Sequence, residues 1–274
     1  MPAEIRNRIY VLVLGGQTLH VYRKEELYNE VVLRLCMATA TDENIMARLK
    51  DPDGQLVFAR YVDRHRRCNP HEAIHEWDPK KLKLSLLQTC SQIHSEAALI
   101  PFQTMTFAIS ELKLLKSLVA RLSPTQARAV RSISTDDLYP FYSLASVKAL
   151  QGLRNLCLFC EEDENSFDIA WQRSVLASLQ GVPDLTGRAV SFEFAFAGWI
   201  KFQRLPLTSV QVAMYLPKSH DKSGKFGPDE RNLCDAVAAA LETRLLSTWD
   251  EDVYRRRLKA GEISRVGIAG QATW

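Results

Sequence analysis

Side chains of the kinds that bind zinc are concentrated between residues 65 and 75 of this chain. They are separated from one another by two or three residues, and they are His65, Cys68, His71 and His75. Imidazole nitrogens and cysteine thiolates are the usual ligands of zinc. Structural zinc sites, however, are built from two well-separated ligand pairs, and the three arginines between residues 64 and 67 oppose a dication by their charge. We therefore interpret this stretch as a solvated polar loop and expect no metal or other cofactor. If a metal did bind here, these four residues would be its candidate ligands.

The other reactive side chains do not indicate a catalytic group. Cys157 and Cys160 form a Cys-x-x-Cys pair, but residues three apart on a strand point to opposite faces, so both are interpreted as core cysteines. His94 has no serine, cysteine or carboxylate arranged around it by spacing, which favours a packing role. The chain is predicted not to be an enzyme. The alternative, an enzyme of unknown type, requires a cleft that gathers groups such as His94, Glu96 and His65.

The composition indicates a globular protein with a substantial core. The chain has 274 residues, of which 46% are hydrophobic and 24% are charged, and its formal net charge is +3. This mild excess points neither to nucleic acid nor to an anionic membrane, and no apolar run approaches the roughly 20 residues that span a bilayer. The six cysteines are scattered along the chain, which suits reduced thiols. We expect an intracellular protein, cytoplasmic or nuclear, without disulfides and without a membrane partner.

The N-terminal residues have the pattern of an amphipathic helix from about Pro2 to Leu14. Proline suits the first helical position, and Gly15-Gly16 ends the helix. The apolar stripe at helical spacing consists of Ile5, Ile9, Leu12 and Val13. This stripe must be buried either against the protein's own core, which helix statistics favour, or against a partner.

A second amphipathic helix is predicted to start at Asp78-Pro79, an N-cap followed by a proline, and to end before Pro101. Its apolar stripe consists of Leu86, Cys90, Ile93 and Ala97. Like the first helix, it has one face that needs a core or a partner.

Together the two segments resemble the fungal F-box-like domain family. The family's motif Leu-Pro-x-Glu-Ile-Arg-x-x-Ile-Tyr is matched at Pro2, Glu4, Ile5, Arg6, Ile9 and Tyr10. Its second motif, Leu-Leu-x-x-Cys-x-Gln-Ile-x-x-Glu-Ala followed by a strand, is matched at Leu86, Leu87, Cys90, Gln92, Ile93, Glu96, Ala97, Thr106 and Phe107. The combination is more specific than either half and covers about the first 110 residues.

The resemblance implies a protein-interaction module. F-box helices present an apolar surface to the Skp adaptor of a cullin ubiquitin ligase, while the rest of the chain binds a target. A helix that lies in a groove needs apolar anchors at helical spacing and a polar rim. The candidate partner-binding residues are Pro2, Ile5, Ile9, Leu12, Leu86, Cys90 and Ile93. The alternative is that the two segments are a structural cap that binds nothing.

The chain departs from the family pattern in two places. Met1 stands where the family has leucine preceded by several residues, as expected of a chain whose true start lies upstream. An insertion of about sixty residues, from about 15 to 78, separates the two motifs. Within it we predict strands at residues 18–23 and 55–62 and helices at residues 25–38 and 42–50.

Beyond Pro101, strands and helices alternate. The predicted strands are residues 104–109, 129–134, 154–159, 190–197 and 209–215, and the predicted helices are residues 111–122, 144–150, 167–179 and 228–259. This alternation predicts an α/β fold with a mostly parallel sheet. Val130-Arg-Ser-Ile and Leu153-Arg-Asn-Leu lie 23 residues apart, close to the period of a leucine-rich repeat.

We therefore predict three parts. Residues 1–100 hold the F-box-like helices and the insertion, residues 101–259 form a degenerate leucine-rich-repeat-like domain with a C-terminal helix, and residues 260–274 form a mobile tail. The most concrete function is that of a substrate receptor in a Skp-cullin-F-box type ubiquitin ligase. A nucleic-acid binder that uses basic segments 60–67 and 255–259 is a further alternative, although a solvated face and a helix C-terminus explain those segments better.

Overall fold

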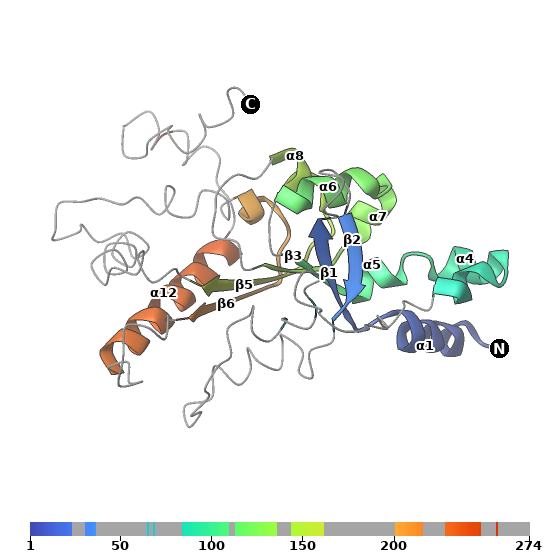
Figure 1. Cartoon of the computed structure of the whole chain (residues 1–274), viewed down its shortest axis with the longest axis horizontal. Helices are drawn as coiled ribbons and strands as arrows, with labels where there is room; N and C mark the ends of the chain where they lie inside the picture. The colour runs from blue at the N-terminus through green and yellow to red at the C-terminus, as the bar shows by residue number, and fades with distance from the viewer. Residues whose placement is uncertain are drawn as a thin grey trace.

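The computed structural model describes residues 1–23, 31–36, 65, 68, 84–109, 113–135, 144–161, 201–215, 228–247 and 256. These residues form a central sheet with helices around it and a pair of helical segments at one end of the molecule (Figure 1). That pair includes α1 (Ala3–Leu14) and α4 (Ser91–Ala97), whereas α12 (Pro228–Leu246) lies at the opposite end.

Among the described residues, six strands form one mostly parallel sheet. They are β1 (Thr18–Arg23), β2 (Val31–Leu35), β3 (Thr106–Ile109), β4 (Ser132–Thr135), β5 (Asn155–Glu161) and β6 (Ser209–Tyr215). The order across the sheet is β2-β1-β3-β4-β5-β6, and only the pairing of β2 with β1 is antiparallel. The prediction of an α/β fold with a mostly parallel sheet is confirmed. Because β1 pairs with β3, the sheet includes residues from both sides of position 100.

The two faces of the sheet differ in composition because successive side chains of a strand point to opposite faces. One face carries an aligned row of buried apolar side chains, which are Leu19, Phe107, Ile133, Leu156 and Val210. The opposite face carries an aligned row of polar side chains, which are Thr18, Thr106, Ser132, Asn155 and Ser209. Further along this second face His20, Ala108 and Ser134 are also buried, so both faces of the sheet are at least partly covered. The apolar face is covered by helices.

Helices from three parts of the chain supply that cover. They are α6 (Lys113–Arg121), α8 (Leu144–Ala149) and α12, together with the 3-10 helix η3 (Lys201–Arg204). Leu118 of α6, Val147 of α8 and Leu241 of α12 belong to the same core cluster as the apolar strand residues. Burial of one such side chain stabilises the fold by about 1.5–3 kcal/mol. The main core therefore lies between this face of the sheet and these helices.

A smaller apolar cluster lies apart from the main core. It is formed by α1, α4 and α5 (Ile100–Thr104), and its buried members are Tyr10, Leu14, Ala97 and Ile100. The half-buried side chains of Leu86, Leu87 and Ile93 pack against it. The two motif segments, about eighty residues apart in sequence, thus pack against each other.

β2 shows that the helix predicted over residues 25–38 is wrong. Val31 and Leu35 are buried while Leu33 between them is 38% exposed, which is the alternation of a strand. The apolar residues of this segment also fit a helical spacing. The strand is favoured because β2 pairs with β1, which satisfies the hydrogen bonds of the β2 backbone. The pairing runs from Leu19 opposite Leu35 to Arg23 opposite Val31.

The single helix predicted from residue 79 to residue 100 is also wrong. The described part is divided into the 3-10 helix η2 (Leu84–Gln88), α4 and α5. Cys90 interrupts the helix because its backbone is extended, with φ −161° and ψ 162°. Pro101 lies in the first turn of α5, where a missing N–H has no cost, and so begins a helix that it was expected to end. Another short helix, α7 (Pro124–Ala129), was not predicted and begins at a capping box formed by Ser123 and Gln126.

Several predicted elements lie outside the described residues. They are the helix at 42–50, the strand at 55–62, the helix at 167–179, the strand at 190–197 and the tail at 260–274. The basic segments 60–67 and 255–259 also lie outside them, except for His65 and Arg256. Among the helices that the structure describes, none has the length and apolar character to cross a membrane.

Candidate functional site

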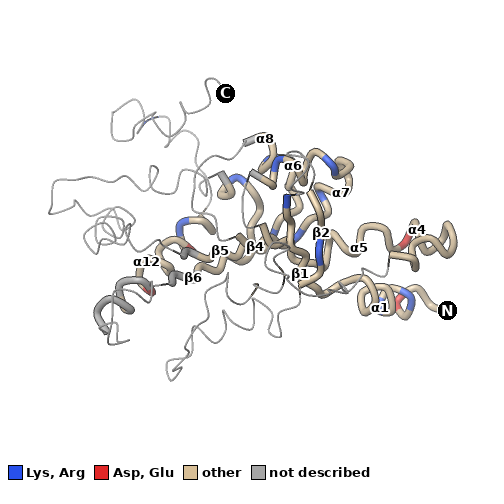
Figure 2. The backbone as a smooth tube through the Cα atoms, viewed as in Figure 1, with Lys and Arg blue, Asp and Glu red and all other residues tan. Residues whose placement is uncertain are grey.

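The side chain of Glu96 joins α4 to α1. The guanidinium of Arg6 donates two hydrogen bonds to the Glu96 carboxylate, with N···O distances of 2.9 and 2.7 Å. Tyr10 Oη donates to the same carboxylate at 3.1 Å, and the side-chain amide of Gln92 donates at 3.0 Å. Figure 2 shows acidic and basic positions on α1 and an acidic position on α4, where the two helices lie side by side. A fork-to-carboxylate pair of this kind fixes orientation as well as distance.

The contacts around Glu96 shift the pKa values of Glu96, Arg6 and Tyr10. The hydrogen bond from Arg6, followed by the one from Gln92, lowers the pKa of Glu96 from 4.5 to about 2. The same hydrogen bond raises the pKa of Arg6. Burial, and then the hydrogen bond to Glu96, raises the pKa of Tyr10. The carboxylate is therefore ionised, and Tyr10 is a neutral donor, throughout the neutral pH range.

The side of α1 that faces away from Tyr10 and Leu14 is apolar and exposed. Ile5 is 47% exposed, Ile9 is 40% exposed and Leu12 is 78% exposed. These three residues follow one another at intervals of four and three, so they form a single stripe on the helix. Single exposed apolar residues are common on protein surfaces, whereas a contiguous exposed group of large aliphatic side chains often marks an interaction site.

The remaining predicted partner-binding residues are divided between exposed and half-buried positions. Pro2 is exposed at the start of α1. Cys90 is exposed, and its sulfur accepts a hydrogen bond from the backbone N–H of Ile93 at 3.5 Å, so it serves as the N-cap of α4. Leu86 and Ile93 pack against the small cluster between the helices. The exposed apolar face therefore comes mainly from α1.

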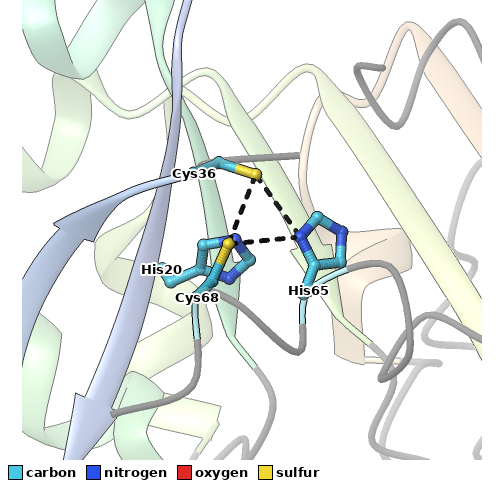
Figure 3. Close-up of side chains that lie close together, drawn as sticks. All are labelled: His20, Cys36, His65 and Cys68. Atoms are coloured by element: carbon cyan, nitrogen blue, oxygen red, sulfur yellow. Dashed lines mark hydrogen bonds between the residues drawn. The ribbon is translucent and has the colours of Figure 1, made fainter. Parts of the chain in front are cut away.

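A second constellation brings four zinc-ligand side chains together at the β1 end of the sheet (Figure 3). They are His20, Cys36, His65 and Cys68, and their ligand atoms all lie within 4.8 Å of one another. Cys36 Sγ lies 3.3 Å from His65 Nδ1, and Cys68 Sγ lies 3.9 Å from each of these two atoms. The rings of His20 and His65 meet edge to face, with centroids 4.6 Å apart.

Of this cluster, only His65 and Cys68 are candidate ligands predicted from local spacing. His71 and His75, the other two predicted candidates, lie outside the described residues. His20 and Cys36 are brought in by the pairing of β1 with β2, which local spacing does not reveal. Cys36 was predicted to lie in a helix at residues 25–38, which does not place it near His20. If β2 is a strand paired with β1, side-chain alternation puts Cys36 and His20 on the same face.

The polar face of the sheet contains a cavity of about 350 Å³. Its lining includes the aligned row Thr18, Thr106, Ser132, Asn155 and Ser209, one residue from each parallel strand. Thr106 Oγ1 donates to Ser132 Oγ at 3.0 Å within this row. Hydroxyl and amide groups of this kind offer hydrogen bonds to a ligand but contain no nucleophile activated by a neighbouring base.

The groups that an enzyme would have to gather have separate partners. Glu96 is bound to Arg6 and Tyr10, as described above, while the Nδ1 atom of the exposed His94 lies 3.3 Å from the carbonyl oxygen of Leu87. His65 belongs to the cluster with the two cysteines. These contacts assign each group a structural environment of its own.

Comparison with known proteins gives one match. A family model described as a domain of unknown function, DUF7730, matches residues 1–204. Neither a curated protein nor a solved structure matches the chain significantly. The matched range includes α1, α4, the histidine-cysteine cluster and strands β1 to β5. Because this range is well over half of the sequence, the chain belongs to the DUF7730 family.

Proposed function

We propose that the chain is a protein-interaction module that acts as a substrate receptor of a Skp-cullin-F-box type ubiquitin ligase. In this proposal α1 and α4 are the F-box-like unit, and α1 presents its apolar stripe to a Skp-type adaptor. The sheet, in a degenerate leucine-rich-repeat-like arrangement, binds the target.

The observation that carries the proposal is the exposure of Ile5, Ile9 and Leu12 on a helix whose orientation is fixed. Tyr10 and Leu14 are buried on the other side of α1, and the Arg6–Glu96 pair holds that side against α4. A helix with no further role would turn its largest aliphatic side chains inward, because each gains about 1.5–3 kcal/mol on burial. An adaptor groove would provide that burial on binding.

The packing of α1 against α4 supports the F-box-like interpretation. The insertion between the two motifs does not separate them, since Arg6 and Tyr10 both bind Glu96 across 86 to 90 positions of sequence. All of these residues belong to the motifs that resemble the F-box-like family. The resemblance thus falls on residues that form one packed unit.

The arrangement of the strands supports the second half of the proposal. Among the described strands, the parallel ones β1, β3, β4, β5 and β6 are neighbours in their order along the chain. Repeat proteins use such sheets as extended binding surfaces. The polar row from Thr18 to Ser209 and its cavity lie on the face opposite to the one against which α6, α8 and α12 pack.

A pull-down from fungal lysate with the full chain tests the adaptor interaction. The wild-type chain should recover the Skp-type adaptor, and Ile5→Asp or Leu12→Asp should abolish recovery, because a carboxylate in an apolar groove loses its hydration. Asn7→Asp is the matched control, since it adds the same charge at an exposed position of the same helix outside the apolar stripe. Absence of the adaptor from the wild-type sample, while a known F-box protein recovers it, would refute the proposal.

A separate substitution tests target binding. Asn155 is exposed on the polar face and lines the cavity, so Asn155→Arg should remove co-purifying polypeptides other than the adaptor while adaptor recovery stays unchanged. Loss of both together would show that the two surfaces are not independent.

A further inference from the structure

The histidine-cysteine cluster begins with two residues that the sheet itself places side by side. His20 lies on β1, and its register partner on β2 is Arg34. Cys36 lies two positions beyond Arg34, and its backbone N–H donates to the carbonyl oxygen of Thr18 at 2.8 Å, which continues the pairing. Because side chains two apart share a face, His20 and Cys36 project from the same face of the sheet.

The other two residues come from a different part of the chain. His65 and Cys68 are separated by two residues, a common spacing within a zinc-ligand pair. They reach the sheet across the 28 residues from 37 to 64. The four side chains therefore form two pairs that are well separated in sequence, as structural zinc sites require. The run from residue 65 to residue 75 alone does not contain two such pairs.

The three distances among Cys36, Cys68 and His65 lie near the edges of a tetrahedron around zinc, and the His20 ligand atom lies within 4.8 Å of the other three. With Zn–S near 2.3 Å and Zn–N near 2.0–2.1 Å, a tetrahedral site separates two sulfurs by about 3.8 Å and a sulfur from a nitrogen by about 3.6 Å. The two sulfurs of Cys36 and Cys68 are 3.9 Å apart, and the two sulfur-to-His65 distances are 3.3 and 3.9 Å. A disulfide needs its sulfurs about 2.05 Å apart, so this geometry is not that of a covalent bridge.

The environment and the charge of the cluster also suit zinc. His20 is 3% exposed, His65 is 5% exposed and Cys68 is fully buried. Two thiolates cancel the charge of a divalent cation, so the loaded centre would be neutral and its burial would not leave a net charge in the interior. Four protein ligands leave no open position for water or substrate, which characterises a structural site. Thiolate and imidazole together favour zinc over calcium, magnesium and manganese.

We propose that His20, Cys36, His65 and Cys68 bind one structural Zn²⁺ ion that fastens the segment around residues 65–68 to the polar face of the sheet. On binding, the thiol protons of Cys36 and Cys68 are released to solvent as the two Zn–S bonds form, and the two imidazoles bind as neutral ligands. The bound ion closes a long loop onto β1, and closing such a loop stabilises the folded chain against the unfolded one. This inference is independent of adaptor binding.

Metal analysis of the full chain, purified without a histidine tag and under reducing conditions, tests the proposal. Wild-type protein should contain about one zinc per chain, as a four-ligand site binds a single ion, and Cys36→Ser and Cys68→Ser should contain almost none. Two controls are available. Cys157→Ser changes another cysteine on the polar face, and the double variant His71→Ala, His75→Ala removes the remaining sequence-based candidates. Both should keep the full zinc content.

Cobalt substitution keeps the test valid if the cysteine variants fail to fold. Co²⁺ added to demetallated wild-type protein should give the visible spectrum of a tetrahedral site and a thiolate-to-metal charge-transfer band, and added Zn²⁺ should remove both. A wild-type chain with no zinc and no cobalt spectrum would overturn the proposal. So would intact-mass evidence for a Cys36–Cys68 disulfide in freshly prepared protein, or the loss of zinc in the His71 and His75 variant alone.

Discussion

The carboxylate of Glu96 is the charged group through which α4 holds α1. Its pKa is lowered from 4.5 to about 2 by its hydrogen bonds, first by the one from Arg6. A lowered pKa means that the ionised form favours the folded state, so this stabilisation is complete above about pH 4.5 and is lost as the pH falls towards 2. The contact is partly exposed, with side-chain exposures of 27% and 26%, and salt should weaken it.

We therefore expect the stability advantage of the wild type over Glu96→Gln to depend on pH. In urea unfolding, the wild-type chain should be more stable at pH 6, and the difference between the two proteins should shrink between pH 4.5 and pH 2 as the carboxylate becomes protonated. A difference that is the same at pH 6 and pH 3 would contradict the assignment of this ion pair.

Gly15, the C-cap residue of α1, lies against Thr104 of α5. A Cβ added to Gly15 would collide with Oγ1 of Thr104 and would lie 2.9 Å from the carbonyl oxygen of Val11. Gly15→Ala should lower the free energy of unfolding by roughly 1–3 kcal/mol, as overpacking does elsewhere. Thr104→Ala in the same chain should recover part of the loss, because it removes the hydroxyl. Denaturant unfolding of the double-mutant cycle measures this coupling, and additive losses would exclude the close contact.

Successive residues of β3 face the main core and the polar row. Phe107 is 1% exposed in the main core, whereas its neighbour Thr106 belongs to the polar row. Phe107→Ala should cost about 3–5 kcal/mol of unfolding free energy, since it leaves a large cavity. Thr106→Ala should cost at most about 1.5 kcal/mol, because it removes one hydrogen bond to Ser132. Equal losses in urea unfolding would mean that both faces of β3 are packed alike.

α12 packs against β6, which is the outer strand of the sheet among the described residues. β6 is the last strand in the order, and the backbone N–H of Val212 donates to the carboxylate of Glu242 at 2.9 Å. A carboxylate at this position occupies a donor that would otherwise be available to another chain. Glu242→Ala should speed hydrogen exchange at Val212 and increase light scattering on storage, whereas Glu242→Gln, which keeps an acceptor, should change both much less. Unchanged exchange in Glu242→Ala would contradict this role.

Across the whole chain, the elements that could be predicted from the sequence are those with strong local signals. β1 and β6 match their predicted ranges, and β3, β5 and α8 lie within a few residues of theirs, because β-branched runs and turn residues mark them. The mostly parallel sheet followed from their alternation. β2 was misassigned because its apolar residues fit both periods, and only its pairing with β1 decides between them.

The candidate sites could be predicted only in part. The motif segments were identified, but the exposure of Leu12 and the burial of Tyr10 depend on how α1 packs against α4 and α5. The histidine-cysteine cluster combines residues 20, 36, 65 and 68, whose proximity depends on strand register and on the return of a distant segment. Neither the strand register nor the return of a distant segment can be predicted from the spacing of residues along the chain.

Calorimetric titration of a purified Skp-type adaptor with the full chain measures adaptor binding directly. The account predicts one adaptor per chain with a negative heat-capacity change, because Ile5, Ile9 and Leu12 become buried. It also predicts that Leu12→Asp abolishes the binding heat while Asn7→Asp retains it. Absence of binding at concentrations that saturate a known F-box protein, or equal affinity for the wild type and Leu12→Asp, would contradict the account.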